Sequence, residues 1–298
     1  MSFLKKICVC LLCLIAFKAG AFSILTKVEN LSEDKLSLAS YPDYYPFAYG
    51  QKNLNLGYDS ESVFKMALEK NVPERMSYFL FPYYETVNDV VYDMEDGKVQ
   101  IFMGAFYSTS SFNELDFVFP AILNSPIHLM MVLSKISEVK QTEDLKKLKG
   151  IYVEREAFSD YMLKTFQDLN MTSVETPDEA YEKLIVGDVD FILGSYYYHY
   201  AKVLERGLKD YVSFSSRPLW NMPMFFAISK KTEDRKTVHE YFRRLASSDA
   251  FHQDLLDIIK EMIKQKEEES VGVVPPMYVR KAQDGELTPA DEAKEAEK

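Results

Sequence analysis

Two stretches of the sequence decide the fold: Gly97-Lys-Val-Gln-Ile-Phe-Met-Gly-Ala-Phe-Tyr107 and Gly187-Asp-Val-Asp-Phe-Ile-Leu-Gly-Ser-Tyr-Tyr197. Each has a glycine turn, a short apolar run, and then a second glycine followed by aromatic residues. An amphipathic helix precedes each copy, and in the first copy Val87, Val90, Val91 and Met94 fall at i, i+3, i+4 and i+7. We interpret the pair as an internal repeat of helix, tight turn and buried strand, although unrelated helix–strand units can also look alike.

Further elements extend the alternation of helices and strands. The sequence predicts a strand at 35–40 and a helix at 61–70 before the first repeat. Between the repeats it predicts a short helix at 142–148, a strand at 150–153, and helices at 157–170 and 176–186. The last begins at Thr176-Pro177, an N-cap followed by proline at the first helical position.

This order is typical of an α/β protein in which each half forms a mostly parallel sheet flanked by helices. Ligands of such sheets bind at the carboxyl ends of the strands. Two sheets therefore predict two lobes that face each other across a cleft, and 298 residues suffice for both.

The first 21 residues have the pattern of a secretory signal. Lys5 and Lys6 precede an apolar stretch at 7–17, and Ala19-Gly20-Ala21 is a small-residue cleavage site. We predict cleavage after Ala21 and a periplasmic location, with an uncleaved anchor as the alternative.

All three cysteines, Cys8, Cys10 and Cys13, lie inside this signal. The mature chain would have no disulfide, no thiolate metal site and no cysteine nucleophile. Loss of Lys5, Lys6 and Lys18 would change the net charge from −11 to −14, which argues against nucleic acid as a partner.

The end of the chain, 266–298, is rich in charge and alanine and lacks apolar periodicity. Such a composition buries too little surface to offset the entropy of ordering, so we predict a disordered acidic tail.

Several short segments, in order and spacing, make the chain resemble family 3 of the bacterial extracellular solute-binding proteins, which serve polar amino acid ABC transporters and have the type II periplasmic-binding fold. The segments are Tyr44-Tyr45-Pro46-Phe47, Gly57-Tyr58-Asp59, Asp96-Gly97-Lys98-Val99, Leu115-Asp116-Phe117-Val118-Phe119-Pro120, Asp144-Leu145-Lys146 to Gly150, and Met224 to Lys230.

The resemblance implies a discontinuous first lobe, 34–127 plus 221–265, and a second lobe, 128–220. Two strands, near 124–130 and 216–224, would form the hinge. The protein would be a monomer that closes on a small-molecule ligand and then docks on the membrane permease of an ABC transporter.

The residues that hold an α-amino acid in this family differ here. Ser111 occupies the position where an arginine of the family commonly binds the ligand carboxylate. Ser195 occupies the position of an aspartate that often receives the ligand amine, and Tyr41 that of a further acidic residue of the family. Glu156 occupies a helix N-terminus that usually receives an anion. We therefore predict that ordinary α-amino acids are not the ligand.

Aromatic residues remain to line the cleft, and their faces suit cations, planar rings or sugars, so we predict a small polar, aromatic or cationic ligand. Packing inside a lobe explains each of them equally well; Tyr44 matches the family's stacking aromatic. The predicted ligand-binding residues are Tyr41, Tyr44, Gly104, Phe106, Ser111, Glu156, Ser195 and Tyr197.

The sequence shows no catalytic or metal-binding motif and implies no cofactor. We predict a transport binding protein rather than an enzyme. The alternatives are a dehydratase-like enzyme on the same fold and a relative that has lost its ligand and acts as a sensor or interaction module.

Overall fold

The computed structural model describes a set of segments that together cover most of the chain after Asp34: residues 35–42, 44–47, 52–53, 57–58, 62–82, 84, 86–107, 115–136, 139, 142–154 and 164–284. The predicted signal at 1–21, Ser111, Glu156 and residues 157–163 of the helix predicted at 157–170 lie outside the described residues. In the described half of that helix only residues 164–165 are helical, so the prediction is wrong for 166–170, where the chain bends and turns.

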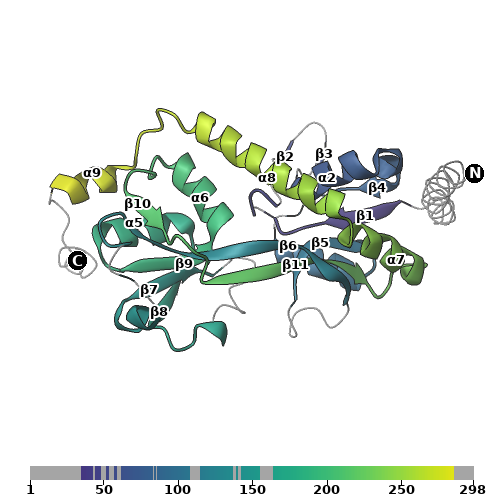
Figure 1. Cartoon of the computed structure of the whole chain (residues 1–298), viewed down its shortest axis with the longest axis horizontal. Helices are drawn as coiled ribbons and strands as arrows, with labels where there is room; N and C mark the ends of the chain where they lie inside the picture. The colour runs from purple at the N-terminus through teal and green to yellow at the C-terminus, as the bar shows by residue number, and fades with distance from the viewer. Residues whose placement is uncertain are drawn as a thin grey trace, which may run out of the picture.

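A large mixed sheet runs through the molecule in the order β4-β1-β5-β11-β6-β9-β7-β8, with β10 paired to β6 (Figure 1). Its strands are β1 (Leu36–Ala39), β4 (Phe79–Leu80), β5 (Ile101–Phe106), β6 (Leu115–Val132), β7 (Gly150–Val153), β8 (Met171–Val174), β9 (Phe191–Ser195), β10 (Val212–Phe214) and β11 (Trp220–Ser229). A separate hairpin pairs β2 (Lys52–Asn53) with β3 (Gly57–Tyr58).

Each end of this sheet is parallel, as predicted: β4-β1-β5 at one end and β9-β7-β8 at the other. We call the part around β1 and β5 the first lobe and the part around β7 and β9 the second lobe. The two predicted sheets are joined into one because β6 has 18 residues, enough to pair with β11 along its first part and with β9 further on.

The hinge is the antiparallel pair of β6 and β11. In the register of this pair, Leu123 lies opposite Met224 and Ile127 lies opposite Trp220. Met224 also pairs with Phe106 at the end of β5, and Ile127 pairs with Ser195 at the end of β9. The carboxyl ends of the two repeat strands therefore meet at the same short stretch of hinge.

Helices cover both faces of the sheet: α2 (Val63–Asn71), α3 (Val87–Glu95), α5 (Pro177–Val186), α6 (Tyr196–Glu205), α7 (Arg235–Ala246), α8 (Asp249–Glu269) and α9 (Met277–Asp284), with the 3-10 turns η1 (Pro73–Tyr78) and η3 (Thr142–Lys147). The predicted start of α5 is confirmed, since the Thr176 hydroxyl accepts a hydrogen bond from the Glu179 N–H.

The repeat is confirmed in three dimensions. Gly97 follows α3 with φ +82°, and Gly187 follows α5 with φ +94°, so each copy turns through a left-handed residue that favours glycine. The buried strands β5 and β9 come directly after these turns.

Two hydrophobic cores support the lobes. The main core fills the first lobe and continues past the hinge to Phe191, Leu193 and Tyr198. A smaller core surrounds α5 in the second lobe, and it includes Val279 of α9.

The predicted disorder from residue 266 is wrong for residues 266–284. Helix α8 continues to Glu269, and α9 packs against α5. The polar composition of the segment predicted disorder, but one of its few apolar residues, Val279, is fully buried and holds α9 against the second lobe. Residues 285–298 lie outside the described part.

Across the described segments, every helix is too short or too polar to cross a membrane.

Candidate functional site

The loop after β1 places two tyrosines against the end of β5. The Tyr41 hydroxyl accepts a hydrogen bond from the Phe106 N–H at 3.2 Å, and the Tyr41 ring stacks on the Phe106 ring with centroids 5.3 Å apart. Burial raises the pKa of Tyr41, so its phenol stays neutral at every physiological pH. This side chain is held in place as a neutral, apolar wall.

A chain of three buried hydroxyls crosses the hinge. The Tyr44 hydroxyl lies 3.1 Å from the Ser125 Oγ on β6, and the Ser125 Oγ lies 3.1 Å from the Ser195 Oγ at the end of β9. Each hydroxyl can donate one hydrogen bond and accept another, so the chain pairs these groups without any formal charge. It joins the first lobe, the hinge and the second lobe.

Aromatic rings of the two lobes also touch directly. Tyr44 stacks on Tyr198 of α6 with centroids 5.8 Å apart and planes 27° apart. Phe47 meets the edge of Tyr197 at 5.8 Å. Tyr44 is only 2% exposed and Tyr198 7%.

We call this set of side chains the aromatic junction: Tyr41, Tyr44, Phe47, Phe106, Tyr197 and Tyr198. Its members come from the loop after β1, the end of β5 and the start of α6. All six are neutral, and all but Tyr197 are buried.

Gly104 supports the junction from within β5. Its φ is +79°, and a Cβ built on it would lie 2.6 Å from the Phe64 ring. Only glycine combines this backbone conformation with the close approach of that ring. The observed reason for a glycine here is therefore packing.

The structure brings together most of the residues predicted for the site. Tyr41, Tyr44, Phe106, Ser195 and Tyr197 meet around the hinge, whereas Ser111 and Glu156 fall outside the described residues. That any of them contacts a ligand stays a prediction.

Three further residues of this site were missed: Phe47, Ser125 and Tyr198. Ser125 lies in the predicted hinge and could have been noted as a polar residue in an apolar strand. For Tyr198 no clear signal exists, because consecutive tyrosines on a helix point in directions about 100° apart.

Two of the four histidines, His128 and His199, have structural partners. His128 on β6 directs its Nδ1 to the Ser215 carbonyl at 2.7 Å, and burial lowers the pKa of this ring, so it is neutral at pH 7. His199 on α6 is buried, with its Nδ1 2.8 Å from the Tyr181 hydroxyl. In the part of the chain that the structure describes, no three histidine, cysteine, aspartate or glutamate side chains are grouped as a metal site requires.

A hollow of about 570 Å³ lies beside the junction, on the α6 side of β10. It is lined by His128, Tyr196, Tyr197, Tyr200 and Phe214 among others. The aromatic rings that line it already pack against each other. Tyr196 stacks on Tyr200 with ring centroids 5.3 Å apart, and the centroid of Phe214 lies 5.1 Å from that of Tyr196.

No protein-family model and no curated protein matches the sequence. Solved structures do match. A protein from Wolinella succinogenes DSM 1740, described as a binding component of an ABC transporter and complexed with lysine, superposes with a TM-score of 0.60 and 18% identity, over 77% of this chain and 95% of that chain.

Two other solved structures are similar. A double mutant of the VFT2 domain of BvgS from Bordetella pertussis gives a TM-score of 0.59 at 11% identity, over 80% of this chain and 97% of the domain. The ancestral amino-acid-binding protein AncCDT-1, a precursor of cyclohexadienyl dehydratase, gives a TM-score of 0.55 at 19% identity, over 78% of this chain and 98% of that protein.

At these identities the likeness establishes the fold. The chain has the two-lobed α/β architecture of the type II periplasmic-binding proteins. Within that class, it has the fold of the family 3 solute-binding proteins that its sequence resembles.

Proposed function

We propose that the chain is a periplasmic solute-binding protein that captures a small polar, aromatic or cationic molecule between its lobes, for an ABC-type importer. The supporting observation is the meeting of predicted site residues from both lobes at one stretch of hinge. Tyr44 of the first lobe reaches Ser195 of the second through Ser125. A ligand placed there would contact both lobes and favour the closed form.

The chemistry of the junction argues against an ordinary α-amino acid. Ser195, at the position where the family often has an amine-binding acid, is fully buried and hydrogen-bonded to Ser125. Tyr41, at the position of another acid, is a neutral phenol bonded to the Phe106 N–H. An α-ammonium group placed between them would lose its hydration without gaining a carboxylate, which is costly.

Entry of a ligand requires the junction to open. In the closed arrangement Tyr44 and Tyr198 are stacked, so a ligand can reach these rings only after the lobes rotate apart at the β6–β11 hinge. A ligand with a planar or cationic group could then replace one ring of this stack, since aromatic faces favour both.

Calorimetry with the standard amino acids, followed by a thermal-shift screen of aromatic amines, quaternary ammonium compounds and neutral aromatics, tests this proposal. We expect a hit among the aromatic or cationic compounds, with weaker binding in Tyr197→Ala and unchanged binding in the control Tyr92→Ala, whose ring is exposed on α3. Micromolar affinity for a standard amino acid would refute the predicted ligand class.

A second candidate function is favoured by the same stack. The chain's own Tyr198 lies against Tyr44, the residue that matches the family's ligand-stacking aromatic, so the lobes can close without a guest. A sensor or interaction module of this kind would gain no stability from any small molecule. The thermal-shift screen separates the two functions, because only a solute-binding protein gives a saturable hit.

A further inference from the structure

Helix α8 starts as part of the first lobe. Phe251 and Leu255 are buried in the main core, and the Asp254 carboxylate accepts a hydrogen bond from the Asn71 side chain at 2.9 Å, with the Lys70 Nζ 3.6 Å away. These contacts fix the first half of α8 to α2.

The second half of α8 leaves the first lobe and reaches the second (Figure 1). The Met262 carbonyl still accepts a hydrogen bond from the Tyr45 hydroxyl of the first lobe at 2.7 Å. One turn later the Lys266 Nζ lies 2.9 Å from a carboxylate oxygen of Glu205 on α6, and the Tyr200 hydroxyl donates to the Glu267 carboxylate. Within five residues the same helix contacts both lobes.

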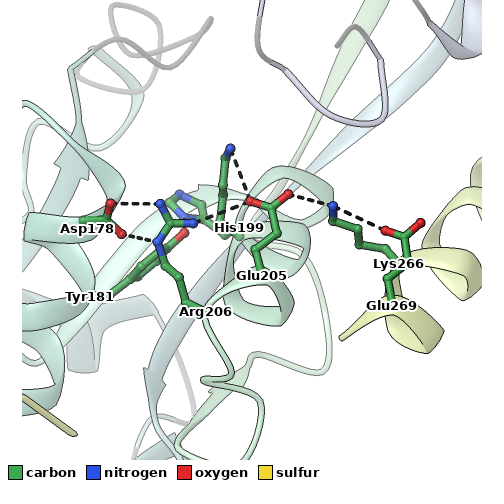
Figure 2. Close-up of polar contacts among 8 residues, drawn as sticks. Asp178, Tyr181, His199, Glu205, Arg206, Lys266 and Glu269 are labelled. Atoms are coloured by element: carbon green, nitrogen blue, oxygen red, sulfur yellow. Dashed lines mark hydrogen bonds and ion pairs between the residues drawn. The ribbon is translucent and has the colours of Figure 1, made fainter. Parts of the chain in front are cut away.

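The contact at Lys266 belongs to a line of alternating charges that continues into the second lobe (Figure 2). The Arg206 guanidinium lies 3.6 Å from a carboxylate oxygen of Glu205 and makes a bidentate salt bridge with the Asp178 carboxylate of α5. Burial tends to raise the pKa of Glu205, but the hydrogen bond from Lys266 and the neighbouring cations outweigh it and lower that pKa. Glu205 is thus held ionised.

The last described helix, α9, lies against the second lobe. Val279 of α9 is fully buried in the core around α5, and the link between α8 and α9 lies on Gly207, where a Cβ would come 2.7 Å from the Val273 carbonyl oxygen. Burial raises the pKa of the neighbouring Tyr278 to about 12. Helix α9 is therefore part of the second lobe's packing.

We propose that residues Met262–Asp284 form a clasp, a third connection between the lobes beside β6 and β11, which holds them closed. Rotation at the hinge would move α6 relative to α8, because the first half of α8 is fixed to the first lobe. The Lys266–Glu205 and Tyr200–Glu267 contacts must then break. While α9 stays docked, the separation of the lobes is limited to the distance over which the seven residues 270–276 can extend, roughly 23 Å.

Spin labels on each lobe test the clasp without any ligand, so the result does not depend on the proposed function. The chain from Phe22 onward contains no cysteine, and Tyr92→Cys on α3 with Thr172→Cys on β8 gives one exposed label per lobe. We expect a single narrow distance distribution in this parent protein. A parent that already populates two distances equally would overturn the proposal.

Lys266→Glu places an acid against Glu205, and Lys264→Glu makes the same charge change on an exposed face of the same helix. We expect Lys266→Glu to raise the population at longer distance by about fivefold or more, and Lys264→Glu to leave it unchanged. Identical distributions in both variants and the parent would refute the clasp.

A second matched pair tests the docked end. Val279→Asp should release α9, seen as faster amide exchange over 277–284, and should broaden the distances between the labels. Met277→Asp, on the same helix but 71% exposed, should do neither. Release of α9 with unchanged label distances would also overturn the proposal, and circular dichroism confirms that each variant is folded.

Discussion

The stack of Tyr44 on Tyr198 gives a direct test of whether the lobes close in solution without a ligand. We consider a double-mutant cycle of Tyr44→Leu, Tyr198→Leu and the double variant. Leucine keeps much of the buried apolar surface but removes the ring. The cycle therefore isolates the interaction between the two side chains from their separate contributions to the core.

The structure gives the expected size of the coupling. The centroids are 5.8 Å apart with planes 27° apart, and both residues are buried, which is a favourable stacked geometry. Aromatic pairs of this kind contribute about 0.5–1.5 kcal/mol beyond burial. A coupling of about 1 kcal/mol corresponds to roughly a fivefold change in the equilibrium between closed and open lobes.

Urea denaturation of the four proteins, followed by far-UV circular dichroism, measures the coupling. Tyr44→Leu combined with Leu208→Ala is the control, because Leu208 belongs to the smaller core and Tyr44 to the main core. The control pair should be additive within about 0.5 kcal/mol. A Tyr44–Tyr198 coupling no larger than the control would mean that the lobes stand apart in solution, and the closed junction would have to be abandoned.

Three further predictions concern glycines, the hydroxyl chain and pH. Gly104→Ala should lower the free energy of unfolding by more than about 3 kcal/mol, and the control Gly187→Ala by about 1–2 kcal/mol. Both glycines have a positive φ, but only at Gly104 would the new Cβ lie against an aromatic ring. Equal losses of stability in calorimetry would contradict this prediction. Ser125→Ala should lower the free energy of unfolding, measured by urea titration, by about 1–3 kcal/mol, because it removes the hydroxyl that Tyr44 and Ser195 share. An unchanged free energy of unfolding would contradict the chain of three hydroxyls. The pKa of Glu205 is lowered on folding, so its contribution to stability is present above its ordinary value of 4.5 and is lost as pH falls below that value. The labelled parent should therefore open as pH falls through this range, and pH-independent distances between the labels would argue against the Lys266–Glu205 contact.

Much of the architecture follows from the sequence because it is encoded locally. Thr86 and Thr176 cap their helices by accepting hydrogen bonds from the N–H groups of Asp89 and Glu179, and the glycine at 187 needs the left-handed region. Such signals involve residues three or four positions apart. The repeat then places the two strand ends symmetrically on the hinge.

The contacts between lobes could not be predicted in the same way. Tyr44 and Tyr198 are more than 150 positions apart, and the direction of each ring is fixed only by the packing of α6 on the hinge. The clasp was missed for a related reason. Its sequence is mostly polar, and two buried apolar residues far apart, Met262 and Val279, with a few ion pairs leave no periodic pattern to detect.

We propose that the absence of an acid at position 195 and the closure of the lobes have one physical origin. An acid at position 195 would be a buried charge beside Ser125, tolerable only when a ligand ammonium pairs with it, so the lobes would tend to stay apart until the ligand arrived. Serine removes that penalty and completes a neutral hydroxyl chain, and Tyr198 supplies the ring that a guest would otherwise provide. In this proposal closure is an internal property that the clasp reinforces, and a ligand would have to compete with the junction for Tyr44 rather than fill a prepared cleft.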